Sequence, residues 1–148
     1  MSQPYYPTDG YAKTMLLART YNLDEIGSAN SGFLGILEGS DIPFEPKRVY
    51  WLRNVPAGVT RGNHAHKLLE QLFIPISGSV QVTLHDGVQE TEIKLTAGNQ
   101  YLYLKPGLWR EISNFSLGAS LLVLASKLYD ESDYIRDWNE FLIWKSNQ

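Results

Sequence analysis

The sequence predicts an all-β protein, a sandwich or barrel of short strands followed by a single helix at the C-terminal end. Short runs rich in β-branched, aromatic and aliphatic residues recur along most of the chain, with turn residues between them. Asp86-Gly87 and Pro106-Gly107 are two such turns, each separating two runs. Apolar residues at helical spacing occur only near the end of the chain. This pattern is typical of sandwiches and barrels, of which the jelly roll is one.

Strands are expected along the chain at 15–21, 32–38, 47–53, 70–76, 79–85, 91–95, 100–104 and 120–126. No internal repeat, low-complexity tract or linker interrupts this series. A single domain over residues 1–148 is therefore expected, with residues 1–12 as a flexible arm because they carry Pro4, Pro7 and Gly10 among polar and aromatic neighbours.

The helix is expected over residues 133–145. Its spacings of three and four form one apolar stripe, made by Tyr134, Trp138, Phe141 and Leu142. Ser132 is the expected N-cap, and acidic residues around the first turn suit the helix dipole. The stripe either packs on the β-structure or forms a dimer contact, and the first interpretation is favoured.

The composition excludes several classes of protein. A net charge of −3, from 13 basic and 16 acidic residues, gives no electrostatic footprint for nucleic acid. No apolar run approaches the length of a membrane-spanning helix, and the first residues do not resemble a signal peptide. The absence of cysteine excludes disulfides and thiolate-held metals. We expect a cytoplasmic protein.

The most informative segment is 58–70, which contains His64 and His66. Residues two apart in a strand project to the same face, so both imidazoles should point together into the β-structure, with Ala65 on the other face. Three interpretations compete: hydrogen-bonded structural histidines, a metal site completed by Glu70, or acid–base catalysis by imidazoles that titrate near neutrality.

The spacing of this segment resembles the first motif of the cupin superfamily. Gly58, His64, His66 and Glu70 keep the spacing of that motif, and Gly78 follows one residue late. The chain also resembles the second cupin motif, at positions Gly98, Pro106, Gly107 and Asn114. Metal-binding cupins carry a fourth ligand, a histidine, where this chain has Arg110. A guanidinium is permanently charged and does not ligate metals, so we expect no metal.

A narrower resemblance is to the WxcM-like dTDP-4-keto-6-deoxyglucose 3,4-ketoisomerases, a branch of the cupins. It is carried by Arg-Gly-Asn-His-Ala-His-Lys at 61–67 with Leu-Glu-Gln at 69–71, and by Lys-Arg-Val-Tyr-Trp at 47–51. Residues 124–126, 129–131 and 133–136 are similar to that family's ending. The resemblance runs from about residue 31 to about residue 138 in the family's order.

This resemblance implies a fold, an assembly and a reaction. The implied assembly is a homodimer of cupin-type jelly-roll subunits, commonly with an N-terminal strand exchanged between them. The implied substrate is a nucleotide-linked 4-keto-6-deoxy sugar, with dTDP as the nucleotide, and the product is its 3-keto isomer. A base removes the proton at C3, an enediol forms, and a proton is delivered to C4. No redox cofactor is required, because a carbonyl and a hydroxyl exchange places.

The resemblance also implies roles for individual residues. We expect His64 to be the base and His66 its partner or a polarising donor, with the reverse assignment left open. Tyr50 is expected to line the cavity and contact the sugar, or to be a structural tyrosine. The remaining predicted substrate contacts are Arg61, Arg110, Trp109, Glu70 and Ser31.

Some of these residues carry an alternative or a departure from the family pattern. Trp109 and Arg110 are expected at a turn near the cavity mouth, and Glu70 either contacts substrate or pairs with Lys67. Ser31 stands where relatives carry residues that bear on the configuration at C4. Three other functions stay open: a sugar-binding cupin without activity, a 3,5-epimerase of the same sugars, and a metal-dependent dioxygenase or isomerase.

Overall fold

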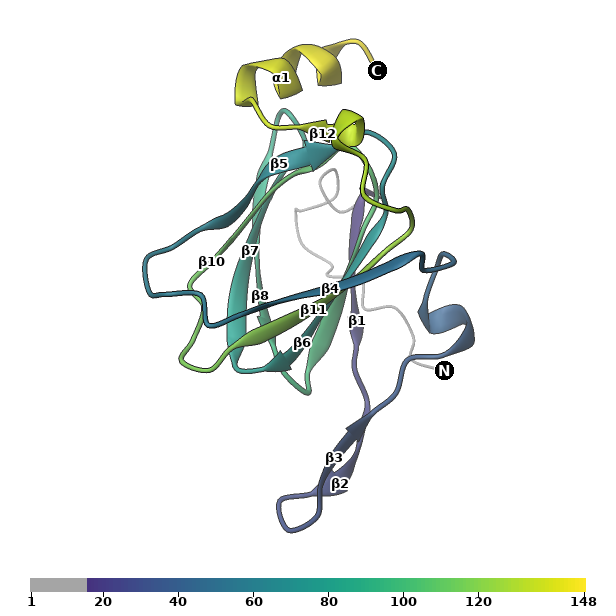
Figure 1. Ribbon diagram of the computed structural model, residues 1–148, viewed down its shortest axis with the longest axis vertical. Coiled ribbons are helices and arrows are strands. Elements are labelled where there is room, and N and C mark those ends of the chain that lie inside the picture. Colours follow the sequence, from purple (N-terminus) through teal and green to yellow (C-terminus); the bar gives the residue numbers. More distant parts are fainter. Residues whose placement is uncertain (1–15) are drawn as a thin grey trace.

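Two five-stranded antiparallel sheets lie face to face in this computed structural model, which describes residues 16–148 (Figure 1). One sheet has the order β1-β9-β6-β11-β4 and the other the order β12-β5-β10-β7-β8. The first sheet comprises Ala18–Asn22 (β1), Gln100–Leu104 (β9), Gln71–Ser77 (β6), Ser120–Ala125 (β11) and Arg48–Arg53 (β4). The second comprises Tyr134–Ile135 (β12), Arg61–His66 (β5), Trp109–Ser113 (β10), Ser79–His85 (β7) and Glu90–Thr96 (β8).

The connections between these strands are those of a jelly roll. From β4 to β11 each strand lies in the sheet opposite to its predecessor, except at the β7–β8 hairpin. The predicted all-β fold with a C-terminal helix is confirmed. The expected arm, residues 1–12, lies outside the described residues.

Each of the eight expected runs overlaps a strand. Sequence reasoning missed β2 (Glu25–Ser28), which pairs with β3 (Gly32–Gly35) in a hairpin that projects from the lower end of the sandwich (Figure 1). It also missed β10 and β12. The prediction of a turn at Trp109 and Arg110 is wrong, because both residues are paired with β7.

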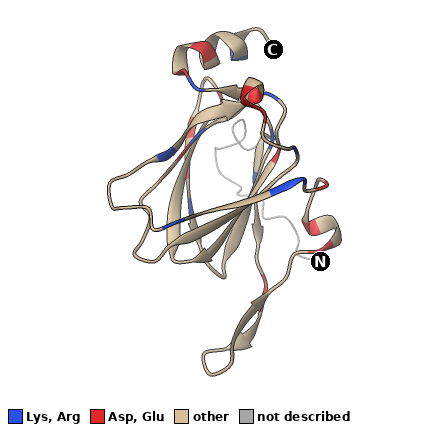
Figure 2. Ribbon diagram, in the orientation of Figure 1, with Lys and Arg blue, Asp and Glu red and all other residues tan. Residues whose placement is uncertain are grey.

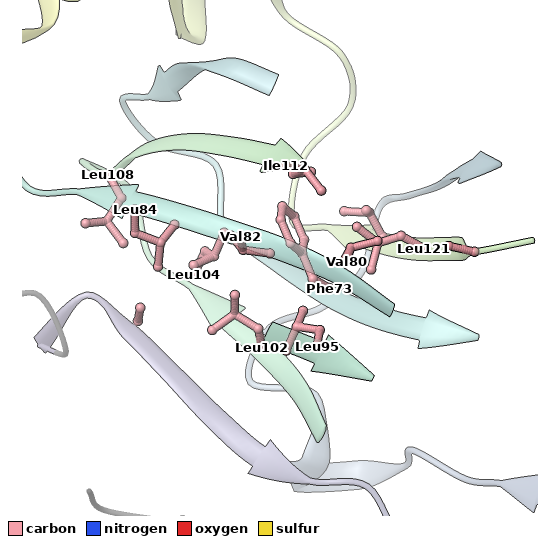
Figure 3. Close-up of a cluster of buried hydrophobic side chains, with 13 residues drawn as sticks. Phe73, Val80, Val82, Leu84, Leu95, Leu102, Leu104, Leu108, Ile112 and Leu121 are labelled. Atoms are coloured by element: carbon pink, nitrogen blue, oxygen red, sulfur yellow. The ribbon is translucent and has the colours of Figure 1, made fainter. Parts of the chain in front are cut away.

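The core fills the space between the sheets, and strand alternation explains its composition. Val80, Val82 and Leu84 on β7 are buried, and the residues between them face outward. They meet Phe73, Leu102 and other side chains of the facing sheet in one continuous cluster (Figure 3). Two stacked inner faces of this kind are the ordinary way in which a sandwich buries its apolar surface.

The turn predicted at Asp86-Gly87 is confirmed. Gly87 has a φ of 100°, a region that glycine adopts without a steric penalty. The Asp86 carboxylate accepts hydrogen bonds from the backbone N–H groups of Val88 and Gln89, both at 2.8 Å. The hairpin therefore satisfies its own backbone while it joins β7 to β8.

The C-terminal helix begins later than predicted. Helix α1 spans Trp138–Ser146, and Asp137, not Ser132, is its N-cap, accepting from the backbone N–H of Glu140. Residues 131–133 form a 3-10 turn, and Tyr134–Ile135 forms β12, which pairs with β5. Phe141 is fully buried against the outer face of the second sheet, so the favoured packing of the stripe is confirmed except at Tyr134. Within residues 16–148 no helix has the length and apolar character needed to span a membrane.

Candidate functional site

A cavity of about 360 Å³ opens between the two sheets, near the end covered by β12. Both sheets contribute to its wall. It is lined by Arg48, Tyr50, Leu52, Arg61, Gly62, His64, Gln71, Phe73, Arg110, Ile112, Val123, Tyr134 and Arg136. Arg61 and Arg136 are exposed, so the cavity meets solvent on their side.

The wall of this cavity is strongly cationic. Four of its lining residues are arginines, and none is Asp or Glu. Arg110 is only 1% exposed, and burial lowers its pKa to about 10, which leaves it charged at neutral pH. Within residues 16–148, the buried Nε atoms of Arg48 and Arg110 find no hydrogen-bond partner. Unsatisfied donors on buried cations are costly, so the cavity is suited to an anionic ligand.

The two histidines lie side by side on β5, as the strand period predicts. Their Nε2 atoms are 3.0 Å apart, and the side chain of Ala65 between them faces away, toward α1. Gly62 allows β5 to approach β10 closely, because a Cβ at this position would lie 2.9 Å from the carbonyl oxygen of Arg110. The pairing register of the two strands shifts at the same place, between Arg110 and Glu111.

Both ends of the histidine pair are held by acceptors. His64 Nδ1 donates to the carbonyl oxygen of Gly62 at 3.0 Å. His66 Nδ1 lies 2.9 Å from Oδ2 of Asp133, whose other oxygen accepts the backbone N–H of Leu68 at 2.6 Å. Neutral imidazole carries one proton, so with both protons on Nδ1 the two Nε2 lone pairs face each other.

Burial keeps both imidazoles neutral. Burial, and then the charge of Arg110, lowers the pKa of His64 to about 4. The same two causes hold the pKa of His66 far below its usual range, although the contact with Asp133 opposes them. His66 is completely buried, and Arg110 and Arg48 add to the effect, so we take desolvation and cationic neighbours to dominate. In the neutral pair no proton therefore lies between the two Nε2 atoms, and this is the one hydrogen bond missing from the chain that runs from Gly62 through both imidazoles to Asp133.

Two tyrosines complete the site. Burial raises the pKa of Tyr50 to about 12, and its hydroxyl oxygen accepts a 2.6 Å hydrogen bond from Gln71 Nε2. The ring of Tyr134, on β12, packs against both imidazoles, with centroids 4.9 Å from His64 and 4.3 Å from His66. The guanidinium of Arg136 lies over the same ring at 4.2 Å.

Of the predicted site residues, Tyr50, Arg61, His64 and Arg110 line the cavity, and His66 lies directly behind His64. Sequence reasoning missed Gln71, Asp133, Tyr134, Arg48 and Arg136. These residues lie within the segments that carry the family resemblance. The sequence therefore contained the motif, but nothing in it assigned a role to these five positions.

Three predicted residues lie away from the cavity. Trp109 faces the outside of the second sheet, where it packs on Trp138 and Phe141. Glu70 accepts a hydrogen bond from the hydroxyl of Tyr103. Ser31 is exposed and belongs to the turn of the β2–β3 hairpin.

Lys67 does not pair with Glu70 but donates to the carbonyl oxygen of Ser132 at 3.2 Å. Over residues 16–148, no three His, Cys, Asp or Glu side chains are grouped so that they could hold a metal ion.

Comparison with known proteins gives a consistent result. Residues 18–146 match the family described as FdtA: WxcM-like, C-terminal. The chain is 39% identical over 123 residues to a TDP-4-oxo-6-deoxy-alpha-D-glucose-3,4-oxoisomerase of Aneurinibacillus thermoaerophilus, covering 83% of this chain and 88% of that relative.

Solved structures resemble the chain over a similar extent. QdtA, a sugar 3,4-ketoisomerase from Thermoanaerobacterium thermosaccharolyticum in complex with TDP, is 38% identical with a TM-score of 0.82, covering 88% of this chain and 95% of that one. A 3,4-ketoisomerase from Helicobacter canadensis is 42% identical with a TM-score of 0.81, covering 87% and 97%.

The proton arrangement of the histidine pair can be tested with Asp133→Asn. The backbone N–H of Leu68 requires an acceptor, so the amide oxygen of the introduced asparagine would face Leu68 and its NH₂ group would face His66 Nδ1. His66 would then carry its proton on Nε2. We expect imidazole ¹⁵N NMR to show Nδ1 protonation of both histidines in the wild type and Nε2 protonation of His66 in the variant.

Asp137→Asn is the matched control, because Asn also serves as an N-cap and this residue is exposed, so it should leave both tautomers unchanged. Nε2 protonation of His66 in the wild type would contradict the arrangement.

Proposed function

Since this chain belongs to the FdtA, WxcM-like family, we propose that it is a sugar 3,4-ketoisomerase acting on a TDP-linked 4-keto-6-deoxyhexose, with His64 as the base. The observation that carries the catalytic assignment is the neutral His64–His66 pair beside a cationic cavity. His64 lines the cavity and His66 does not, so His64 is the imidazole that meets substrate.

The cationic wall suits the charge of the substrate. A nucleoside diphosphate carries its negative charge on oxygens that guanidinium groups recognise well. The buried Nε atoms of Arg48 and Arg110, which no described residue engages, supply donors inside the cavity, and Arg61 and Arg136 add charge near the opening. QdtA is described in complex with TDP, which agrees with such a ligand.

The histidine pair is suited to carry the transferred proton. His64 Nε2 takes the proton from C3, the electron pair of that bond forms the C3–C4 double bond, and the C4 carbonyl becomes an enediolate oxygen. His64 then carries an N–H at Nε2, 3.0 Å from His66 Nε2, so uptake of the proton supplies the donor that the neutral pair lacks. Transfer of the O3 proton to the oxygen at C4, together with delivery of a proton to C4, gives the 3-keto sugar with a hydroxyl at C4. Carbonyl and hydroxyl have exchanged places without an external oxidant.

The relatives favour this activity over the other candidates. The curated relative is an oxoisomerase, and both solved relatives are 3,4-ketoisomerases. No observation on this chain specifically favours a 3,5-epimerase, a sugar-binding cupin without activity or a metal-dependent enzyme.

We also infer that the protein is a homodimer, with the β2–β3 hairpin in the interface. Ile26, Phe33 and Leu34 on this hairpin are each more than half exposed, at 66%, 63% and 58%. Residues 26–37 contain no charged side chain, and Figure 2 shows the projecting hairpin as almost entirely tan. An uncharged apolar hairpin held in water is unfavourable, and burial against a second copy would remove the cost.

A second surface beside the hairpin supports the same inference. A hollow of about 950 Å³, larger than the arginine-lined cavity, lies on the outer face of the first sheet. Its wall is mostly apolar and includes Phe33, Ile74 and Leu124. Strand β1, at the edge of the first sheet, pairs with β9 within the chain. The hairpin and this hollow are therefore the surfaces that we assign to the second copy.

The catalytic assignment predicts a large effect of His64→Asn. The wild type, incubated with TDP-4-keto-6-deoxyglucose in D₂O, should exchange the C3 proton and form the 3-keto isomer, both followed by NMR. His64→Asn should lower both rates by about two to four orders of magnitude and keep TDP binding, because Asn cannot take up the proton. His66→Asn should be less impaired. Wild-type exchange in His64→Asn would show that His64 is not the base, and a wild type without either activity would leave the binding-protein interpretation.

The pH dependence should differ between kcat/KM and kcat. The base works unprotonated, so activity is present above its pKa and lost as pH falls through it. In the free enzyme the pKa of His64 is about 4, so kcat/KM should stay level down to about pH 5. A bound diphosphate offsets the charge of Arg110, so the acid limb of kcat should lie higher by about one pH unit or more. Coinciding limbs would show that Arg110 does not act on His64 in this way.

The dimer can be tested by light scattering at micromolar concentration. The wild type should have the mass of two chains, and Phe33→Asp should shift it toward one chain because it buries a charge in the interface. Val88→Asp, at an exposed apolar position on the β7–β8 turn, should stay dimeric. A monomeric wild type would contradict the inference.

A further inference from the structure

Gln71 occupies a buried position between two groups of the proposed site. It is the first residue of β6, is 1% exposed, and lines the cavity between Arg110 and Tyr50. Arg110 Nη1 donates to Gln71 Oε1, and Gln71 Nε2 donates to the hydroxyl oxygen of Tyr50 at 2.6 Å. Arg110 is itself fixed by a second hydrogen bond, from Nη2 to the carbonyl oxygen of Leu108 at 2.8 Å.

The direction of these hydrogen bonds follows from chemistry. A guanidinium group has donors and no acceptor, so only the amide oxygen of Gln71 can face Arg110. The NH₂ group must then face Tyr50, and the hydroxyl oxygen of Tyr50 must accept. The proton of that hydroxyl consequently points elsewhere than toward Gln71.

The Tyr50 proton is available to a ligand. The hydroxyl lies in the cavity wall, and residues 16–148 supply no acceptor for its hydrogen. Burial, opposed in part by Arg110, raises the pKa of Tyr50 to about 12, so the group is protonated at neutral pH. Because its oxygen already accepts the hydrogen bond from Gln71, this buried hydroxyl is left to donate its proton to a group in the cavity.

We infer that Gln71 is a positioning residue: clamped by Arg110, it holds the Tyr50 hydroxyl as a hydrogen-bond donor to the substrate oxygen that becomes negative in the enediolate. The inference rests on the proposed ketoisomerase activity. When C3 loses its proton, charge moves onto the oxygen at C4, and a donor directed at that oxygen stabilises the enediolate more than the neutral ketone. Loss of this donor should therefore lower mainly kcat.

Gln71→Glu tests this role without disrupting the fold. A carboxylate has the same shape as the amide and accepts at both ends, so Arg110 keeps its partner and gains an ion pair. Tyr50 would then donate its proton to the introduced carboxylate and lose it for the substrate. A purely structural role of Gln71 predicts little change in turnover, because the buried network stays satisfied.

The experiment is a double-mutant cycle of Gln71→Glu and Tyr50→Phe, with kcat and KM measured on TDP-4-keto-6-deoxyglucose. Each single variant should lower kcat by about 10²-fold to 10³-fold, and Tyr50→Phe, which leaves the charge of the cavity unchanged, should change KM by less than about three-fold. The double variant should be no slower than Tyr50→Phe alone, because Gln71 acts through Tyr50. C3 exchange should slow in parallel with turnover.

Gln81→Glu, which makes the same substitution at a site that accepts from Asn114 on the outer face, should stay within about two-fold of the wild type.

Two results would overturn the inference: a kcat of Gln71→Glu within about two-fold of the wild type, or a double variant whose loss is the product of the two single losses. Both presuppose an active wild type. An inactive wild type would instead contradict the proposed function, so the two failures are distinguishable.

Discussion

Arg110 is a permanent positive charge enclosed by the two sheets, and the neighbouring side chains are arranged around it. A buried cation is stable only where hydrogen bonds and opposite charge replace the lost water. Arg110 receives two acceptors from the protein, the carbonyl of Leu108 and the amide oxygen of Gln71. In the part of the chain that the structure describes, its Nε has no partner and no carboxylate lines the cavity with it. The protein therefore tolerates an incompletely compensated charge at the place where an anionic substrate is proposed to bind.

The same charge acts on the groups beside it. Burial, and then this charge, lowers the pKa of His64 and His66, which keeps the imidazoles neutral and able to accept a proton. It also orients Gln71, and so Tyr50. One side chain thus prepares a base and a donor in a single cavity. The cost in stability is offset elsewhere, by the apolar cluster between the sheets and by the strand pairing within each sheet.

Much of this arrangement follows from the period of two in a strand. It places His64 with His66 on one face and Ala65 on the other, and it accounts for the alternating core of β7. The same rule shows why Trp109 was misassigned: adjacent residues of a strand face opposite sides, so Trp109 and Arg110 cannot both line the cavity. Strand β10 was missed because Arg110 and Glu111 interrupt its apolar pattern. The helix start was misplaced because β12 depends on pairing with β5, a contact between residues far apart in the sequence that no local pattern reveals. Asp133 and Gln71 act through such contacts too.

The position of Ala65 links the outside of the protein to its chemistry. This residue separates the two histidines in sequence and packs with Trp109, Ile135 and Phe141 under the C-terminal helix. Strand β5 therefore carries the two imidazoles on one face and packs against the helix with the other. Asp133, which holds His66, belongs to the same C-terminal segment. Looser packing of the helix would therefore change the distance between the two imidazoles. Residues that never contact a ligand thus help to determine how readily a proton passes between them.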